Sequence, residues 1–74
     1  MPPMIGEWVV EVRSVRPFTI HGDLYFEIHV VEPDGAGQIT AVRVPQHAIV
    51  GEPREGERLT LSFLMGQVTG ATRG

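Results

Sequence analysis

Strict alternation of apolar and polar residues is the clearest pattern in the chain, and it occurs in two stretches. Residues 24–31 read LYFEIHVV, which places Leu24, Phe26, Ile28 and Val30 on one face. Residues 59–65 read LTLSFLM and repeat the pattern, with Leu59, Leu61, Phe63 and Met65 on one face. A period of two is typical of a strand that buries one side. Both stretches are therefore predicted to be strands of one sheet.

Three further strands follow from weaker versions of the same pattern. The segment from Trp8 to Val15 alternates with Trp8, Val10 and Val12 inward, and residues 39–44 do so with Thr40, Val42 and Val44 inward. Pro45 ends the latter because proline has no ladder donor. Turns are expected at residues 33–37 (PDGAG) and 66–67, and a short fifth strand at residues 68–72. Residues 46–50, between Pro45 and Gly51, predict one helical turn.

The segment from Phe18 to Asp23 allows two interpretations. Gly22 would fall on the core face of a continuous strand and leave a hole there. We therefore expect residues 18–23 to form a loop or bulged lead-in, with Leu24 as the true start of the second strand. The alternative is one long strand that is kinked by a bulge at Gly22.

Length and composition indicate one small domain spanning residues 1–74. A chain of 74 residues with 42% hydrophobic content has a limited core. Small domains usually need disulfides, metals or oligomerisation to supplement such a core. Disulfides are excluded because the chain has no cysteine. Marginal stability or self-association is the remaining expectation.

The stretch GDLYFEIHVVEPDGAGQITAVRV, together with the element order, carries a fold-level resemblance. It looks like the second and third strands of OB-folds, in which a Gly-x-x-Tyr sequence precedes an apolar strand and a turn that contains glycine. The resemblance implies an all-β, five-stranded Greek-key barrel with a short helical turn between strands three and four. An SH3-like barrel is the alternative fold.

The resemblance to OB-folds also implies a ligand surface on the exposed face of strands two and three. Here that surface would hold Tyr25, Glu27, His29, Ile39, Ala41 and Arg43, bordered by Arg13. Tyr25 and His29 could stack on unpaired bases while Arg13 and Arg43 bind phosphates. The competing interpretation, which we favour, is a solvated sheet face on which Glu27 pairs with Arg13 or Arg43 across strands.

Charge and motif content argue against several function classes. Six basic and nine acidic side chains give a net charge of −3, which provides no general attraction to nucleic acid or anionic membranes. His21, Asp23, His29 and His47 do not follow a known metal-ligand spacing. Ser14 and Ser62 lie in predicted strands without the context of a nucleophile. We expect neither enzyme activity, nor a metal site, nor a cofactor.

The sequence therefore predicts a non-catalytic binding module of the cytoplasm, without a membrane-spanning segment. Outward apolar residues favour protein interaction or self-assembly as a homodimer: Val9, Val15, Val31, Ile39 and Leu64. Leu64 and Val68 would lie in the interface, next to the poorly covered sheet edge of the short fifth strand. Single-stranded DNA or RNA binding of the OB type is the alternative function.

Overall fold

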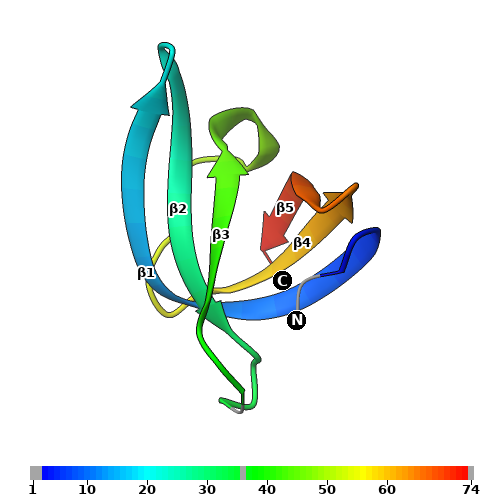
Figure 1. Ribbon diagram of the computed structural model, residues 1–74. Helices are drawn as coiled ribbons and strands as arrows, with labels where there is room; N and C mark the ends of the chain where they lie inside the picture. Colours follow the sequence, from blue (N-terminus) through cyan, green and yellow to red (C-terminus); the bar gives the residue numbers. More distant parts are fainter. Residues whose placement is uncertain (1–2, 36, 74) are drawn as a thin grey trace.

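A computed structural model describes residues 3–35 and 37–73 of the chain. This part forms one antiparallel sheet of five strands with almost no helix (Figure 1). The elements in chain order are β1 (Gly6–Ile20), β2 (Asp23–Val31), β3 (Thr40–Pro45), a 3₁₀ turn η1 (Gln46–Ala48), β4 (Arg58–Leu64) and β5 (Gln67–Arg73). The expected all-β fold and the helical turn after the third strand are confirmed. No helix in the described residues has the length and apolar character needed to span a membrane.

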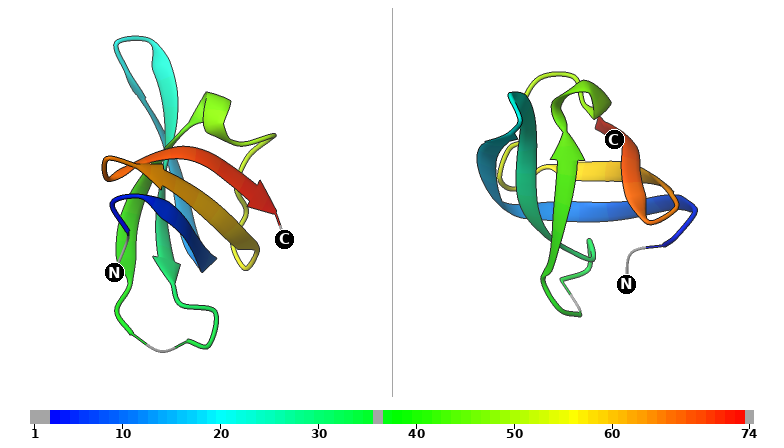
Figure 2. Two further views of the ribbon diagram at one scale, coloured as in Figure 1. Left: turned by 90° about the vertical axis from the view of Figure 1, so that its right-hand side faces the viewer. Right: turned by 45° about the horizontal axis from the view of Figure 1, so that its top comes forward.

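Strand β1 belongs to both halves of the sheet, whose order is β3-β2-β1-β4-β5. Residues 6–11 pair with β4, and residues 11–20 pair with β2. The register shifts between Val12 and Ser14, where Arg13 forms a bulge. At this point the Val12 N–H donates to the Glu57 carbonyl (2.9 Å), and the Val12 carbonyl accepts from the Gly56 N–H (2.8 Å). Bulges bend strands, and here the two halves of the sheet cross over each other (Figure 2).

The core lies between the two halves of the folded sheet. Phe26 is 2% exposed and Phe63 is 6% exposed, which confirms the inward faces predicted for the two cleanest strands. The other buried members of the cluster come from all five strands and from the residue after η1: Val10, Val12, Ile28, Val30, Val42, Val44, Ile49, Leu59, Leu61, Val68 and Ala71. Trp8, Val15 and Leu24 are partly buried and pack against this cluster. One core therefore supports both halves.

The sheet is open, because its two edge strands, β3 and β5, do not pair. They nevertheless lie close to each other. Among the described residues, no ladder and no backbone hydrogen bond joins these two strands. Closure of a barrel requires that last ladder. The structure thus confirms five antiparallel strands in one sheet, whereas the Greek-key barrel and the SH3-like alternative are not confirmed.

Both interpretations of residues 18–23 are wrong. Strand β1 continues through Phe18 and Thr19 to Ile20, and β2 begins at Asp23. Between them, His21 (φ 51°) and Gly22 (φ 85°) form a two-residue turn. Two consecutive positive φ angles are the mark of a type I′ turn, whose twist matches that of the flanking strands. Gly22 lies in the turn, so no hole arises in the core.

Three other details of the expected faces need correction. The turn after β4 lies at Met65 and Gly66, one residue earlier than predicted. Met65 therefore adopts a positive φ (54°) and is 75% exposed, instead of facing inward. Val31, expected to face outward, is 5% exposed beside the buried Val30. Val15, also expected outward, packs against the core because the bulge at Arg13 shifts the register of β1. In the turn predicted at residues 33–37, the Gly35 N–H donates to the Glu32 carbonyl (2.9 Å), and Ala36 is outside the described residues.

Candidate functional site

The outer surface of β2, β3 and the second half of β1 carries most of the residues that the resemblance to OB-folds had indicated, whereas Ile39 lies in the loop before β3. The strand register sets three rows across this surface. They are Ser14–His29–Ala41, Arg16–Glu27–Arg43 and Phe18–Tyr25–Pro45. We call this surface the aromatic face. It brings together Tyr25, Glu27, His29, Ala41 and Arg43, as predicted.

An aromatic pair lies at the far end of the aromatic face. The rings of Phe18 and Tyr25 are stacked, with their centroids 5.7 Å apart and an angle of 23° between their planes. The Arg43 guanidinium lies 5.2 Å from the centroid of the Phe18 ring, within the range of a cation–π contact. Phe18 is absent from the sequence-based site because residues 18–23 were expected to form a loop. Its alternation with Thr19 and Ile20 was the signal that could have identified it.

The ion pair at the centre of the aromatic face involves an arginine that the sequence did not single out. Glu27 forms an ion pair with Arg16, with 3.3 Å between Glu27 Oε1 and Arg16 Nη2, and neither Arg13 nor Arg43 is its partner. Arg13 lies in the bulge and pairs with Glu11 instead (3.7 Å). The bulge shifts the register by one residue, which brings Arg16 directly opposite Glu27. A cross-strand pair on this face was thus expected, but with the wrong partner.

Ser14 and His29 meet at the other end of the aromatic face. The Ser14 Oγ and His29 Nδ1 atoms are 3.0 Å apart, close enough for a hydrogen bond. Among the described residues, His29 makes no further side-chain hydrogen bond that would orient its ring as the carboxylate of a Ser–His–Asp triad does. The contact holds the imidazole against the sheet, which restricts its freedom to stack on a ligand.

A second surface, on β4, β5 and the first half of β1, has a different composition. Its register places Val9 opposite Thr60, and Glu7 opposite Ser62. The Gly66 N–H donates to the Met4 carbonyl (2.9 Å), which holds the segment before β1 against the β4–β5 turn. Exposed apolar side chains gather along this surface, and we call it the apolar face: Met4, Ile5, Val9, Leu64 and Met65.

The two residues predicted for an interface lie on opposite sides of the sheet. Leu64 is 54% exposed and belongs to the apolar face. Val68 is 6% exposed and packs in the core with Phe63, its register partner. Of the two, only Leu64 therefore has a largely exposed side chain.

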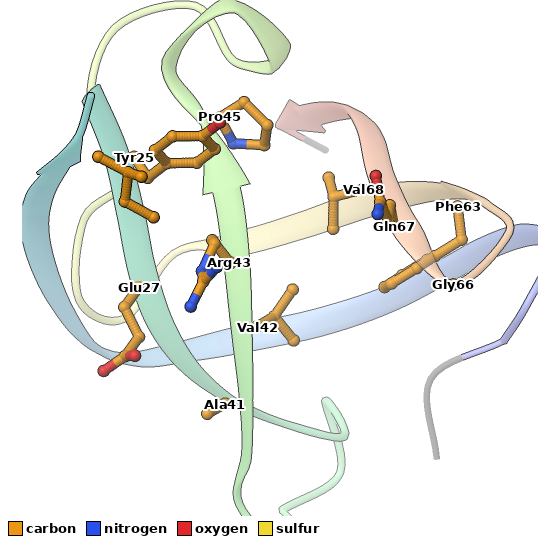
Figure 3. A pocket seen from close by; sticks show the side chains of 11 residues that line it. Tyr25, Glu27, Ala41, Val42, Arg43, Pro45, Phe63, Gly66, Gln67 and Val68 are labelled. Carbon is orange, nitrogen blue, oxygen red and sulfur yellow. The ribbon is translucent and has the colours of Figure 1, made fainter. Parts of the chain in front are cut away.

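A groove runs beside β3, with a volume of about 560 Å³ (Figure 3). Tyr25, Glu27 and Arg43 of the aromatic face lie toward one side of it. Phe63, Gln67 and Val68 of the β4–β5 hairpin lie toward the other side. Ile20, Ala41, Val42, Pro45 and Gly66 complete the lining. The groove therefore connects the two halves of the molecule along an edge of the sheet.

The histidines and acidic residues do not assemble into a metal centre in the described part of the chain, where no three such side chains are grouped as ligands. His21 lies in the β1–β2 turn, His29 on the aromatic face and His47 in η1.

No protein-family model, curated protein or solved structure matches the chain.

Proposed function

We propose that the chain is a non-catalytic binding module that associates with a second copy of itself through the apolar face. One observation carries this proposal. Of the seven large hydrophobic residues that are exposed in the described part of the chain, five lie on this face. The other two, Ile39 and Val50, lie in separate loops. Met4, Leu64 and Met65 gather at the β4–β5 turn, where the Gly66 N–H donates to the Met4 carbonyl. A cluster of exposed apolar side chains is the usual mark of an interaction site.

The charge distribution supports a second copy as the occupant. Two chains of net charge −3 repel each other unless their contact surfaces carry few charges. The central rows of the apolar face contain Thr60, Ser62 and Val9, with Glu7 as their charged residue. Two copies related by a two-fold axis can therefore approach through this face at little electrostatic cost. Burial of Leu64 would also supplement the small core.

Sedimentation velocity tests this proposal. At tens of micromolar, we expect the wild-type chain to sediment with about twice the 8.1 kDa mass of one copy. Leu64→Glu places a charge on the apolar face and should yield monomers. Ile39→Glu is the matched control, because Ile39 is similarly exposed (61%) but lies far along the chain from this face. A monomeric wild type, or a Leu64→Glu variant that stays dimeric, contradicts the proposal.

The closed OB-like barrel is a related structural proposal. The order β3-β2-β1-β4-β5 leaves β3 and β5 at the two edges of the sheet, and their approach supports closure as a further step. Slow hydrogen exchange at alternate amides of both strands in the free protein would indicate that this ladder forms. Fast exchange along both edges would indicate a permanently open sheet.

Single-stranded nucleic-acid binding is the second candidate, and the Phe18–Tyr25 stack beside Arg43 is the observation that favours it. Aromatic platforms contribute about 1–3 kcal/mol per stacked base. Anisotropy of a labelled 15-nucleotide oligo-dT strand is the measurement, with Arg58→Ala as a control outside the aromatic face. Weaker binding by Tyr25→Ala and Arg43→Ala, together with a monomeric wild type, would replace the first proposal with this one.

A further inference from the structure

The outer edge of β3 is free of backbone partners. Strand β3 pairs with β2 on one side, and in the described residues no strand or loop donates to its other side. Along an edge strand, alternate residues direct their N–H and C=O groups away from the sheet. The groove beside β3 is therefore bordered by backbone groups that can pair with another extended chain.

Strand β3 also lacks most of the features that protect sheet edges. Its sequence, TAVRVP, contains no lysine, and its buried side chains, Val42 and Val44, are apolar. Pro45 removes one donor, but only at the last position of the strand. Lysines, inward charges and central prolines are the usual means by which an edge avoids pairing. The edge of β3 from Thr40 to Val44 is thus unpaired, and an added strand would separate it from the nearby β5.

The side chains around the groove determine which peptide would fit. An added strand directs alternate side chains to the two faces of the sheet. On the inner face they would meet Val42, Phe63 and Val68, which are apolar. On the outer face they would meet Arg43. An alternating apolar and polar peptide matches both environments.

Arg43 determines which charged side chain of a peptide the groove would favour. Among the described arginines, Arg13, Arg16 and Arg73 have carboxylate partners within 4 Å. Arg43 has none, although Glu27 is its register partner, because Glu27 binds Arg16 instead. The contact of Arg43 is with the Phe18 ring, at 5.2 Å. Its guanidinium is therefore available to bind an acidic side chain from outside the chain.

We propose that the groove beside β3 binds an extended peptide that pairs with the free edge of β3 and places an acidic side chain against Arg43. The groove meets the apolar face only at Gly66, which bonds Met4, and none of the five residues of the apolar face lines it. The proposal therefore does not depend on self-association. It requires the open sheet, because a β3–β5 ladder would occupy the same edge. Strand addition of this kind takes its affinity from main-chain hydrogen bonds and its specificity from alternate side chains.

Fluorescence anisotropy with two labelled, capped nine-residue peptides provides the test. One alternates valine with glutamate, and the other alternates valine with lysine. The chain has a net charge of −3, so non-specific attraction would favour the lysine peptide. We expect the glutamate peptide to bind more tightly. Arg43→Gln should weaken that binding by about two- to fivefold, the size of an exposed ion pair, and should remove the preference. Arg58→Gln, an exposed arginine of β4, should leave the preference intact.

Backbone pairing is tested with the same glutamate peptide N-methylated at alternate residues, in the two possible phases. The phase that blocks the edge facing β3 should abolish binding, whereas the opposite phase should retain it. Hydrogen exchange should slow at alternate amides of residues 40–44. Four results would each overturn the proposal. The first two are equal binding by both N-methylated peptides, and hydrogen-exchange protection on the apolar face instead of β3. The other two are no binding by either unmethylated peptide, and an unchanged preference for the glutamate peptide in a folded Arg43→Gln variant.

Discussion

The outer surface of the sheet changes character along the single strand β1. Before the bulge at Arg13, β1 contributes Val9 to the apolar face, together with β4 and β5. After the bulge, it contributes Arg16 and Phe18 to the aromatic face, together with β2 and β3. Among the described residues, no polar or charged side chain is buried in either half. The difference is confined to the side that the core does not constrain.

This contrast teaches where function is encoded in a fold of this size. Inward positions on both halves must hold apolar side chains that pack closely, because they fill one core. Outward positions are free to differ, and here they separate into a surface suited to burial against apolar groups and one suited to charged or aromatic ligands. The bulge at Arg13 marks the boundary, and it also sets which arginine meets Glu27.

The largest effect is expected from the core that both halves share. Phe26→Ala and Phe63→Ala remove buried rings beneath the aromatic and the apolar half, and each should cost about 3–5 kcal/mol of unfolding free energy. Urea unfolding followed by Trp8 fluorescence measures both variants. Equal losses indicate one cooperative core. A near-normal midpoint for either variant would show that its half of the sheet is stabilised independently.

An intermediate effect should distinguish the arginines of the two halves. At the end of β5, Arg73 Nε donates to Glu57 Oε2 (2.9 Å) and Nη2 to the Glu52 carbonyl (2.6 Å), while Nη1 donates to the Val50 carbonyl. Arg16, with its side chain 72% exposed, has only the ion pair with Glu27.

Because Arg73 holds the loop before β4 through several acceptors, Arg73→Ala should cost about 1–2 kcal/mol. Arg16→Ala should cost less than about 1 kcal/mol, as exposed ion pairs do. Chemical denaturation gives both values. The ranking fails if Arg16→Ala proves the more destabilising change.

The smallest effect concerns the two hairpin turns, one in each half. His21 and Met65 both adopt positive φ before a glycine, a position that asparagine occupies more easily. His21→Asn and Met65→Asn should each raise stability by about 0.5–1 kcal/mol. Thermal unfolding measures the gain.

Sedimentation separates the two turn variants, because only Met65 lies on the apolar face. Met65→Asn should weaken self-association, whereas His21→Asn should leave it unchanged. If both variants associate like the wild type, the turn at Met65 lies outside the contact.

Much of the fold could be predicted because a strand pattern is local. The faces of Phe26 and Phe63 follow from a period of two, and no tertiary information is needed to assign them. The β1–β2 turn was not recognised, because His-Gly is not one of the dipeptides, such as Asn-Gly or Asp-Gly, that signal a two-residue hairpin, and Gly22 was interpreted within a strand. The candidate site was predicted in part: Tyr25 and Arg43 lie on one face, but Phe18 and Arg16 were not identified.

The sequence by itself determined that the chain forms a small sheet, which residues of its clearest strands face inward, and that the core is limited. Tertiary structure alone decided which strands are neighbours, which edge of β3 stays open, and that Val68 is buried while Leu64 is exposed. The reason is physical. Inward and outward positions are set by adjacent residues, whereas register, bulges and free edges depend on hydrogen bonds between segments far apart in the chain.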